Sequence, residues 1–487
     1  MFRSVYPVVA GPGEATLSGS HVSSLDMRLR GLATALTGAA IGLAPIWWHV
    51  NVVDPHIDNI TSVFREVGIY PTDVCLAGLA AIAVVRPVAL DARARQVALG
   101  LAVLAGAALL SSLASLDRTL GAALAGHLAL LTLAWLGVRA GQVPRRALVI
   151  ALVAVAAVQS MLAFGQFVLQ QTLVPPELNL PWLPSDVSQG GTPVVLSSAG
   201  DRLLRGFGTF PHPNILGGYL ALALVCLPVL RHAWPRGAML WWLVGGVLVA
   251  GLLASFSRAA WLAALAGLGT WWWMCRRRGR AGWSLLGLVP LTAALVALSP
   301  LAPTVATRVF PFGPESNALE RGSVENRLAL DRSGVSEAMD HLPLGVGGGN
   351  YGVVALAEGY QEGWGEPAPN LALLIATELG IPGVLAAGVV VAGVLGAVVR
   401  RGGVDVAPAA AGLALLVLAM VDHYLWTMPL GRVIAWSGLA LLAARQPRSM
   451  ESALDASGGR GAAAGATRPD RPDTTEGEAD RPGTRGG

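Results

Sequence analysis

Residues 147–169 read ALVIALVAVAAVQSMLAFGQFVL and contain no charged side chain. A helix needs about 20 predominantly apolar residues to cross the roughly 30 Å hydrocarbon core of a bilayer. This run is long enough, and soluble cores do not repeat such runs along one chain. The stretch therefore predicts a membrane-spanning helix over residues 146–170.

Comparable apolar runs recur along most of the chain. Hydrophobic residues make up 54% of the sequence and charged residues only 13%, a balance typical of bilayer proteins. The further spans are expected near residues 31–50, 72–90, 96–116, 119–138, 214–231, 238–254, 258–275, 282–303, 370–399, 406–426 and 431–445. The sequence thus predicts an all-α, polytopic transmembrane helix bundle with about 12 spans, over residues 31–445.

The basic residues, all of them arginine, alternate between the predicted connections. Short cytoplasmic connections normally carry most basic residues, so arginine-rich connections such as 86–95, 139–146 and 276–280 are assigned to the cytoplasm. Residues 1–30 then form a cytoplasmic N-terminal segment. The first span is interpreted as an uncleaved signal anchor, because no apolar stretch with a cleavage site precedes it.

This orientation places two long loops, about 171–213 and 304–369, on the extracytoplasmic side of the cytoplasmic membrane. Such loops are more often functional than idle, because ordering them has an entropic cost. Residues 446–487 are rich in Gly, Arg, Asp, Pro and Thr, which predicts a disordered cytoplasmic tail. We expect both termini to be cytoplasmic and the chemistry to lie on the outer face.

Composition argues against several classes of site. Cys75, Cys226 and Cys275 fall within or at the ends of apolar runs, and no histidine lies at metal-ligand spacing. Neither a disulfide framework nor a metal site is indicated, and no cofactor is expected. Basic and aromatic residues do not interleave, which argues against nucleic-acid binding.

Arginines on the outer side run against the usual charge bias, and binding an anionic group such as a diphosphate is one reason to place them there. Arg258 opens a span directly after Ser255-Phe256-Ser257, where its guanidinium could hold phosphate oxygens. The alternative is an interfacial arginine whose stem is buried while its head reaches water. Arg205, Arg327 and Arg432 are further arginines at this side.

Two outer segments have both a functional and a structural interpretation. The glycines of Gly345–Asn350 could turn backbone amides toward an anion, or could simply pack a loop on the bundle. Asn370 begins a span that should bend near Pro382, where it could help bind an anion or act as an ordinary N-cap. Glu378, inside that span, should face the bundle interior or a wet cavity, because lipid contact would be costly.

Polar side chains also punctuate two of the predicted spans. His127 lies in the fourth span, and Gln159 and Gln166 lie in the fifth. In an apolar surrounding such groups most often form hydrogen bonds between helices, and this is the interpretation we favour.

Five ordered segments together resemble the O-antigen ligase and polymerase superfamily. Each is short, and it is their order and their positions at span ends that carry the resemblance. They are Gly208-Thr209-Phe210-Pro211-His212-Pro213-Asn214, Ser257-Arg258-Ala259, Glu325-Asn326-Arg327-Leu328 with His341 through Tyr351, Asn370 through Gly383, and Asp422-His423-Tyr424-Leu425-Trp426-Thr427. The core motifs span residues 208–432, whereas earlier spans are similar only in hydropathy.

The resemblance implies a metal-independent, inverting glycosyltransferase that uses a polyprenyl-diphosphate-linked glycan as donor and a glycan, lipid or protein as acceptor. By this resemblance, Arg258 and Arg327 hold the diphosphate. The candidates for the catalytic general base, Glu366, His341 and His212, follow instead from their location on the predicted outer side. The substrate-binding candidates are Arg205, His212, Asn214, Asn350, Asn370, Asp422, His423 and Arg432. Such an enzyme would act in cell-surface polysaccharide assembly.

One departure from the family pattern keeps other functions open. The histidine that precedes the asparagine of the late span in ligases is Pro369 here, and proline cannot accept a proton. The alternatives are a transporter or flippase of a lipid-linked anionic substrate, and a catalytically inactive partner that binds glycan lipid. A transporter would place charged residues near the bilayer midplane, and it would show internal repeats that this sequence lacks.

Overall fold

The computed structural model describes residues 24–53, 56–57, 60–61, 66–113, 115–174, 192–197, 200–231, 238–277, 287–313, 318–360, 365–400 and 403–445. The chain divides into one compact unit, Met1–Arg445, and a second, Gln446–Gly487. The predicted tail, and the part of the predicted cytoplasmic segment before residue 24, lie outside the described residues.

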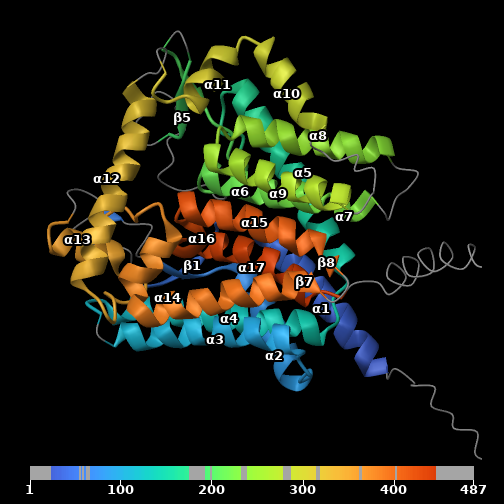
Figure 1. The fold of residues 1–487 in the computed structure, drawn as a ribbon, viewed down its shortest axis with the longest axis vertical. Coiled ribbons are helices and arrows are strands. Elements are labelled where there is room, and N and C mark those ends of the chain that lie inside the picture. The colour runs from blue at the N-terminus through green and yellow to red at the C-terminus, as the bar shows by residue number, and fades with distance from the viewer. Residues whose placement is uncertain are drawn as a thin grey trace, which may run out of the picture. The chain divides into compact units, whose positions relative to one another are not determined.

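Helices make up most of the described chain (Figure 1). They are α1 (Ser24–Leu43), α2 (Pro71–Val85), α3 (Ala92–Ser112), α4 (Arg118–Ala140), α5 (Arg145–Leu169), α6 (Pro213–Cys226), α7 (Pro228–Arg231), α8 (Ala238–Ala254), α9 (Arg258–Arg277), α10 (Leu288–Ala297), α11 (Ala302–Val309), α12 (Ala318–Asp340), α13 (Tyr351–Ala357), α14 (Leu371–Val398), α15 (Val406–Val421), α16 (Tyr424–Thr427) and α17 (Pro429–Ala443). The all-α prediction is confirmed.

The strands are short and form antiparallel pairs between helices. They are β1 (Val50–Val53) with β4 (Val67–Ile69), β2 (His56–Ile57) with β3 (Ile60–Thr61), β5 (Val194–Leu196) with β6 (Arg202–Leu204), and β7 (Val399–Arg400) with β8 (Gly403–Val404). The predicted outer loop 171–213 therefore contains a β-hairpin that leads directly into Arg205.

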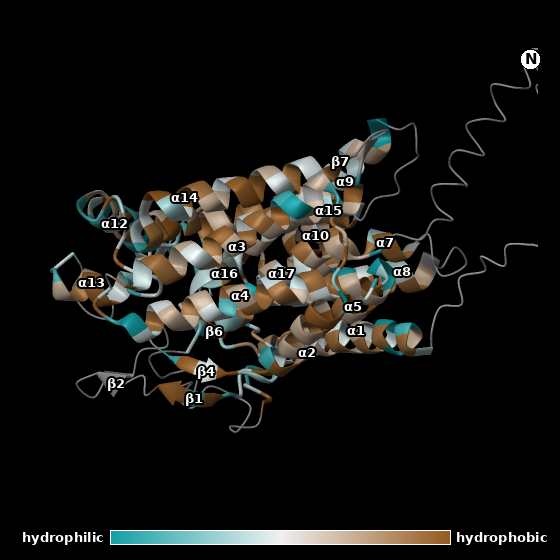
Figure 2. Cartoon of the chain, turned by 90° about the horizontal axis from the view of Figure 1, so that it is seen from below, coloured by the Kyte–Doolittle hydropathy of each residue, from teal (hydrophilic) through white to brown (hydrophobic). Residues whose placement is uncertain are grey.

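The helices have the length and composition of a multi-pass membrane protein. Within the described residues, five helices are long and apolar enough to cross a bilayer, or up to six if the bent pair α10 and α11 forms one span. Helices α2, α8, α15 and α17 are equally apolar in character but shorter. Large apolar side chains such as Val158 and Leu385 are exposed on the long helices, as lipid contact requires, and Figure 2 shows hydrophobic residues along α14, α3 and α4. The figure of about 12 spans stays a prediction.

Three segments differ from the sequence-based boundaries. Helix α1 begins at Ser24 and ends at Leu43, because its first turn uses the charged pair Asp26 and Arg30 and because Pro45 follows its end. The segment predicted as one span over 282–303 contains two helices that meet at 118° around Pro300. The predicted loop 304–369 contains α12, a charged helix that a hydropathy pattern does not detect.

Small residues allow helices to approach closely at several crossings. Helix α14 packs along α3, α15 packs along α9, and α2 packs along α4. At the α2–α4 crossing a Cβ on Gly137 would lie 2.0 Å from the carbonyl oxygen of Leu79. Glycine is therefore required there, as in other close helix pairs within membranes.

A buried ion pair joins the middle of the chain to its last helices. Arg145, at the start of α5, donates two hydrogen bonds to the carboxylate of Asp405, at 2.9 and 3.1 Å, and one to the carbonyl oxygen of Leu441. The two charged side chains are only 5% and 7% exposed. This contact lies at the end of α15 opposite to Asp422.

Helix α14 is broken where the sequence predicts a bend. Gly380 has φ 59° and ψ −152°, and Pro382 follows within the helix. The break frees backbone acceptors for the glycine-rich loop: Val346 donates to Thr377 and Gly347 donates to Glu378. The amide of Gly349 donates to the Glu378 carboxylate at 2.9 Å. The loop-packing interpretation of Gly345–Asn350 is thus the one observed.

The predictions for polar side chains inside the spans are confirmed for some residues and wrong for others. His127 accepts a hydrogen bond from Arg432 of α17 at 2.9 Å, so its predicted interhelical bond is confirmed. Glu378 lines a cavity, as predicted. The prediction was wrong for Gln159 and Gln166, which bind the irregular segment Phe207–Thr209 instead of another helix.

The close α2–α4 crossing gives a first prediction. Gly137→Ala should lower the thermal unfolding temperature of the purified protein in detergent, because overpacking costs about 1–3 kcal/mol. Gly269→Ala is the matched control, since a Cβ there meets nothing within 4 Å. Equal unfolding temperatures for the two variants would contradict the assigned crossing.

Candidate functional site

The turn between α8 and α9 binds two arginines that come from distant parts of the chain. The Ser255 carbonyl accepts a hydrogen bond from Arg205 Nε at 2.9 Å, and the Phe256 carbonyl accepts one from Arg308 Nε at 3.0 Å. Phe256 has a φ of 47°, a left-handed conformation that is unfavourable for a bulky residue. Backbone strain of this kind is concentrated at functional sites, where the surrounding contacts hold it in place.

Glu320 of α12 is the acidic partner of this turn. It is fully buried and accepts two hydrogen bonds from Arg308, both at 2.8 Å. Arg258, the first residue of α9, lies 3.6 Å from the same carboxylate and donates to Ser323 at 3.4 Å. One buried carboxylate therefore holds two guanidinium groups in place.

A second chain of contacts joins Arg205 to Arg327. Arg205 donates to the Asn214 side-chain oxygen at 2.7 Å, and Asn214 in turn donates to Asp422 at 2.9 Å. Arg327 lies 3.8 Å from Asp422 and donates to the Val421 carbonyl at 2.7 Å. These bonds unite the start of α6, the end of α15 and the middle of α12.

Arg205, Arg258, Arg308 and Arg327 are called the basic cluster below. Burial lowers the pKa of Arg205, and the nearby guanidinium groups, Arg308 foremost, lower it further. Against these four cations stand two buried carboxylates, Glu320 and Asp422, so positive charge is in excess among the buried groups. The less buried carboxylates Asp331 and Glu366 lie on the Arg327 side. Arg258 and Arg327 keep 22% and 36% of their side-chain surface exposed. An anion with two or more negative charges suits this arrangement.

The backbone around Arg205 is fixed by side chains of α5. Gln166 accepts from the amides of Phe207 and Gly208, and Gln159 accepts from the amide of Thr209. Gly206 lies so close to α5 that a Cβ would be 2.4 Å from the Ala163 carbonyl oxygen. Helix α5 therefore sets the position from which Arg205 reaches the cluster.

His212 caps α6 next to the basic cluster. Its Nδ1 accepts a hydrogen bond from the amide of Asn214 at 3.1 Å, so the neutral ring carries its proton on Nε2. The ring is accessible to solvent but has protein on several sides; this desolvation and the charge of Arg205 lower its pKa. His212 is therefore a neutral hydrogen-bond donor, and its Nε2 cannot accept a proton in this tautomer.

Glu366 and His423 lie on the Arg327 side of the cluster. The Glu366 carboxylate is exposed and accepts from Asn326 at 3.1 Å. Desolvation and Arg327 lower the pKa of His423, while Asp422 and Glu366 act in the opposite direction. The bond to Asn326, the residue before Arg327, sets Glu366 on this side of the cluster.

The structure thus brings together most of the predicted site residues, namely Arg205, His212, Asn214, Arg258, Arg327, Glu366, Asp422 and His423. Four others lie elsewhere. His341 contacts Glu337 and Glu358, and Asn350 is buried against the backbone of Asp117 and Gly348. Asn370 accepts from the amides of Ala372 and Leu373 as an N-cap, and Arg432 lies beside His127.

Sequence reasoning missed Arg308 and Glu320. Arg308 is an arginine on the predicted outer side, so the argument applied to Arg258 and Arg327 would also have found it. Glu320 gave no such signal, because it precedes Arg321 in a polar stretch and only the fold buries it.

The burial of Glu320 gives a second prediction. Glu320→Gln should lower the free energy of unfolding, by up to about 3–5 kcal/mol, because it leaves buried guanidinium charge uncompensated. Thermal unfolding in detergent measures this, with Glu325→Gln, an exposed position on the same helix, as the control. Unchanged stability of Glu320→Gln would show that Arg308 does not depend on this carboxylate.

Comparison with known families agrees with the motifs. Residues 238–388 match the family model described as O-antigen ligase, a segment of less than a third of the chain. It runs from α8 into α14 and contains Arg258, Arg308, Glu320 and Arg327. A comparison with curated proteins gives no match. The predicted resemblance to the O-antigen ligase superfamily is therefore confirmed, over the segment that carries three of the four arginines of the basic cluster.

Proposed function

We propose that this chain is a membrane glycosyltransferase of the O-antigen ligase type, which transfers or polymerises a polyprenyl-diphosphate-linked glycan. The observation that carries the proposal is the basic cluster, in which four arginines outnumber the two carboxylates buried with them at one end of an apolar helix bundle. A lipid-linked diphosphate brings its negative charge to the membrane surface. It supplies the negative charge that this cluster lacks.

In the proposed reaction Arg258 and Arg327 hold the diphosphate, since their side chains are the more exposed of the cluster. Arg205 and Arg308 are fixed by backbone carbonyls and position the turn around them. An acceptor hydroxyl attacks the anomeric carbon with inversion, and the bond from that carbon to the diphosphate oxygen breaks. Guanidinium groups that are already in place stabilise the charge that develops on the leaving diphosphate.

Glu366 is the general base in this proposal and takes the proton of the attacking hydroxyl. Pro369 cannot serve, His341 contacts residues away from the basic cluster, and the Nε2 of His212 already carries a proton. Glu366 is exposed and bonded to Asn326, the residue before Arg327, where the diphosphate would lie. His212 instead donates a hydrogen bond to a substrate oxygen.

The finer topology belongs to the same proposal. The shorter apolar helices α2, α8, α15 and α17, together with α1 and α9, bring the five or six long spans to about 12. Both termini then lie in the cytoplasm, and the basic cluster lies on the extracytoplasmic face of the cytoplasmic membrane. An undecaprenyl diphosphate carrier, presented at that face, is the donor class that fits. The acceptor is a glycan, lipid or protein hydroxyl.

A transporter or flippase is the second candidate, because one observation favours it. Asp73, His127, Glu378 and Arg432 lie together between α2, α4, α14 and α17, apart from the basic cluster. Charged groups within a bundle are a feature of translocation paths. The two candidates differ in where the lipid-linked precursor accumulates when the protein fails.

The arginine roles give a third prediction. Arg258→Ala and Arg327→Ala should each lower the rate of glycan transfer by about 10²–10³, the usual loss for one electrostatic contact to a transition state. The assay uses purified protein, a defined polyprenyl-diphosphate glycan and several acceptors. Arg332→Ala, at an exposed position of the same helix as Arg327, is the control.

In cells, loss of transfer should leave the lipid-linked precursor on the outer face of the membrane. Precursor retained inside would instead support translocation, and an inactive wild-type protein that still binds the donor would support the role of a binding partner.

The assignment of the base gives a fourth prediction. Glu366→Gln should slow transfer by about 10²–10⁴ without changing donor binding, because only the proton acceptor is lost. Single-turnover rates measure the chemical step, and Glu325→Gln is the control. A Glu366→Gln rate equal to that of the wild type would assign the base to another group.

A further inference from the structure

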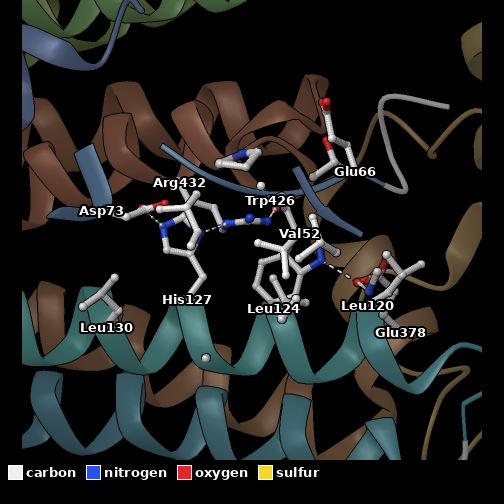
Figure 3. Close-up of a pocket in the computed structure, with 18 of the residues that line it drawn as sticks. Val52, Glu66, Asp73, Leu120, Leu124, His127, Leu130, Glu378, Trp426 and Arg432 are labelled. Atoms are coloured by element: carbon white, nitrogen blue, oxygen red, sulfur yellow. Dashed lines mark hydrogen bonds and ion pairs between the residues drawn. The ribbon is translucent and has the colours of Figure 1, made fainter. Parts of the chain in front are cut away.

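A cavity separate from the basic cluster lies between α2, α4, α14 and α17 and is covered by the β1–β4 hairpin (Figure 3). Its volume is about 460 Å³, within the range of roughly 300–1,000 Å³ that small-molecule sites occupy. Apolar side chains such as Val52, Leu124 and Leu130 form much of its wall. We call it the acidic pocket, for the reason given next.

Three carboxylates face this pocket against one guanidinium. Glu66, Asp73 and Glu378 line it together with Arg432. The single cation is already engaged, since Arg432 donates to His127 at 2.9 Å and to the Trp426 carbonyl at 2.6 Å. Glu66 is also paired with His49, which lies behind the pocket lining. Three carboxylates thus stand against at most two cationic side chains, so the pocket is acidic, the reverse of the basic cluster, and a phosphate is disfavoured.

Several polar atoms at the pocket have no hydrogen-bond partner within the described residues. They are the acceptors Glu66 Oε2 and Asp73 Oδ1 and the donor His127 Nε2, which carries the ring proton because Nδ1 accepts from Arg432 and which lies 3.5 Å from Asp73 Oδ1. The Glu66 side chain is only 5% exposed. Buried polar groups in native proteins are nearly always bonded, so unsatisfied acceptors beside a cavity indicate a ligand that donates hydrogen bonds. Sugar hydroxyls and amines are such donors.

The wall chemistry also suits a sugar ring. The indole of Trp426 lines the pocket and is held by a hydrogen bond from its Nε1 to Glu378 at 2.7 Å, and Tyr351 lies nearby in the wall. A fixed aromatic side chain offers an apolar surface to one side of a sugar, while the carboxylates receive the hydroxyls at its rim.

Two short segments connect the pocket to the basic cluster. Thr427 lines the pocket, and its hydroxyl lies 2.8 Å from Nδ1 of His423, which belongs to the cluster side. Pro367 lines the pocket, and the preceding residue is Glu366, bonded to Asn326. The wall of the pocket is therefore one residue along the chain from the proposed base.

We propose that the acidic pocket holds the terminal sugar of the acceptor, a hydroxyl-rich unit without phosphate, and presents its nucleophilic hydroxyl to Glu366. This inference rests on the proposed glycosyl transfer. It assigns donor and acceptor to two sites of opposite charge: the diphosphate binds the basic cluster, and the neutral or amine-bearing sugar binds the acidic pocket.

The test fills the pocket without disturbing its walls. Gly126 of α4 lines the cavity, and a Cβ there would meet nothing within 4 Å. Gly126→Phe therefore places a ring in the open space, and Gly106→Phe, on the neighbouring α3 and equally uncrowded, is the matched control. The probes are methyl glycosides of glucose, galactose, N-acetylglucosamine and glucosamine, together with glucose 6-phosphate and glucosamine 6-phosphate. Binding to the full chain in nanodiscs is followed by saturation-transfer NMR.

We expect at least one unphosphorylated sugar to bind, with affinity at least tenfold lower in Gly126→Phe and unchanged in Gly106→Phe. Glu66→Gln should weaken the binding of the same sugar, whereas Arg258→Ala should leave that binding unchanged. In the transfer assay, Gly126→Phe should raise KM for the acceptor and leave KM for the donor unchanged.

Three results would overturn the inference: no probe binds, the Gly126→Phe variant binds as well as the wild type, or a sugar phosphate binds as tightly as the free sugar. Sugar binding is measured without turnover. Failure of glycan transfer with intact sugar binding would therefore reject the proposed function and leave the pocket assignment standing.

Discussion

A guanidinium removed from water must find acceptors for its N–H groups, and this requirement organises the functional end of the bundle. Arg205 and Arg308 both satisfy it with carbonyls of the α8–α9 turn, at Ser255 and Phe256. Those two bonds bring α6, α8, α9 and α11 to one point. Arg205 also donates to Asn214 and Arg308 to Glu320, so the site and the helix ends that carry it are specified together.

The two proposed binding regions carry net charges of opposite sign. Around the basic cluster, carboxylates are fewer than arginines, and around the acidic pocket the ratio is reversed. Both regions lie against the short helix α16, which supplies Trp426 and Thr427 to the pocket and follows His423 and Asp422. Opposite charge on the two sides would keep donor and acceptor from exchanging places.

Sequence alone predicts the apolar helices, because a bilayer demands long uncharged runs. It also locates the break in α14, because Pro382 interrupts the helical hydrogen bonds next to Gly380. It also identifies most of the basic cluster from arginines at span ends. It does not predict α12, whose charged residues resemble a loop, nor the β1–β4 hairpin that covers the pocket. Glu66, Asp73 and Arg432 come from separate helices and loops, and only the packing of those elements makes them neighbours.

The pairing of Arg145 with Asp405 has a consequence for how the protein is made. Arg145 is synthesised early, in a connection predicted to face the cytoplasm, but its carboxylate partner and the Leu441 carbonyl follow some 260 and 296 residues later. Until then its guanidinium has no buried counter-charge and can stay in water at the start of α5. The packing of this end of the bundle is therefore completed only when the last helices arrive, and chains truncated before Asp405 should leave it open and be recognised by quality control as incomplete.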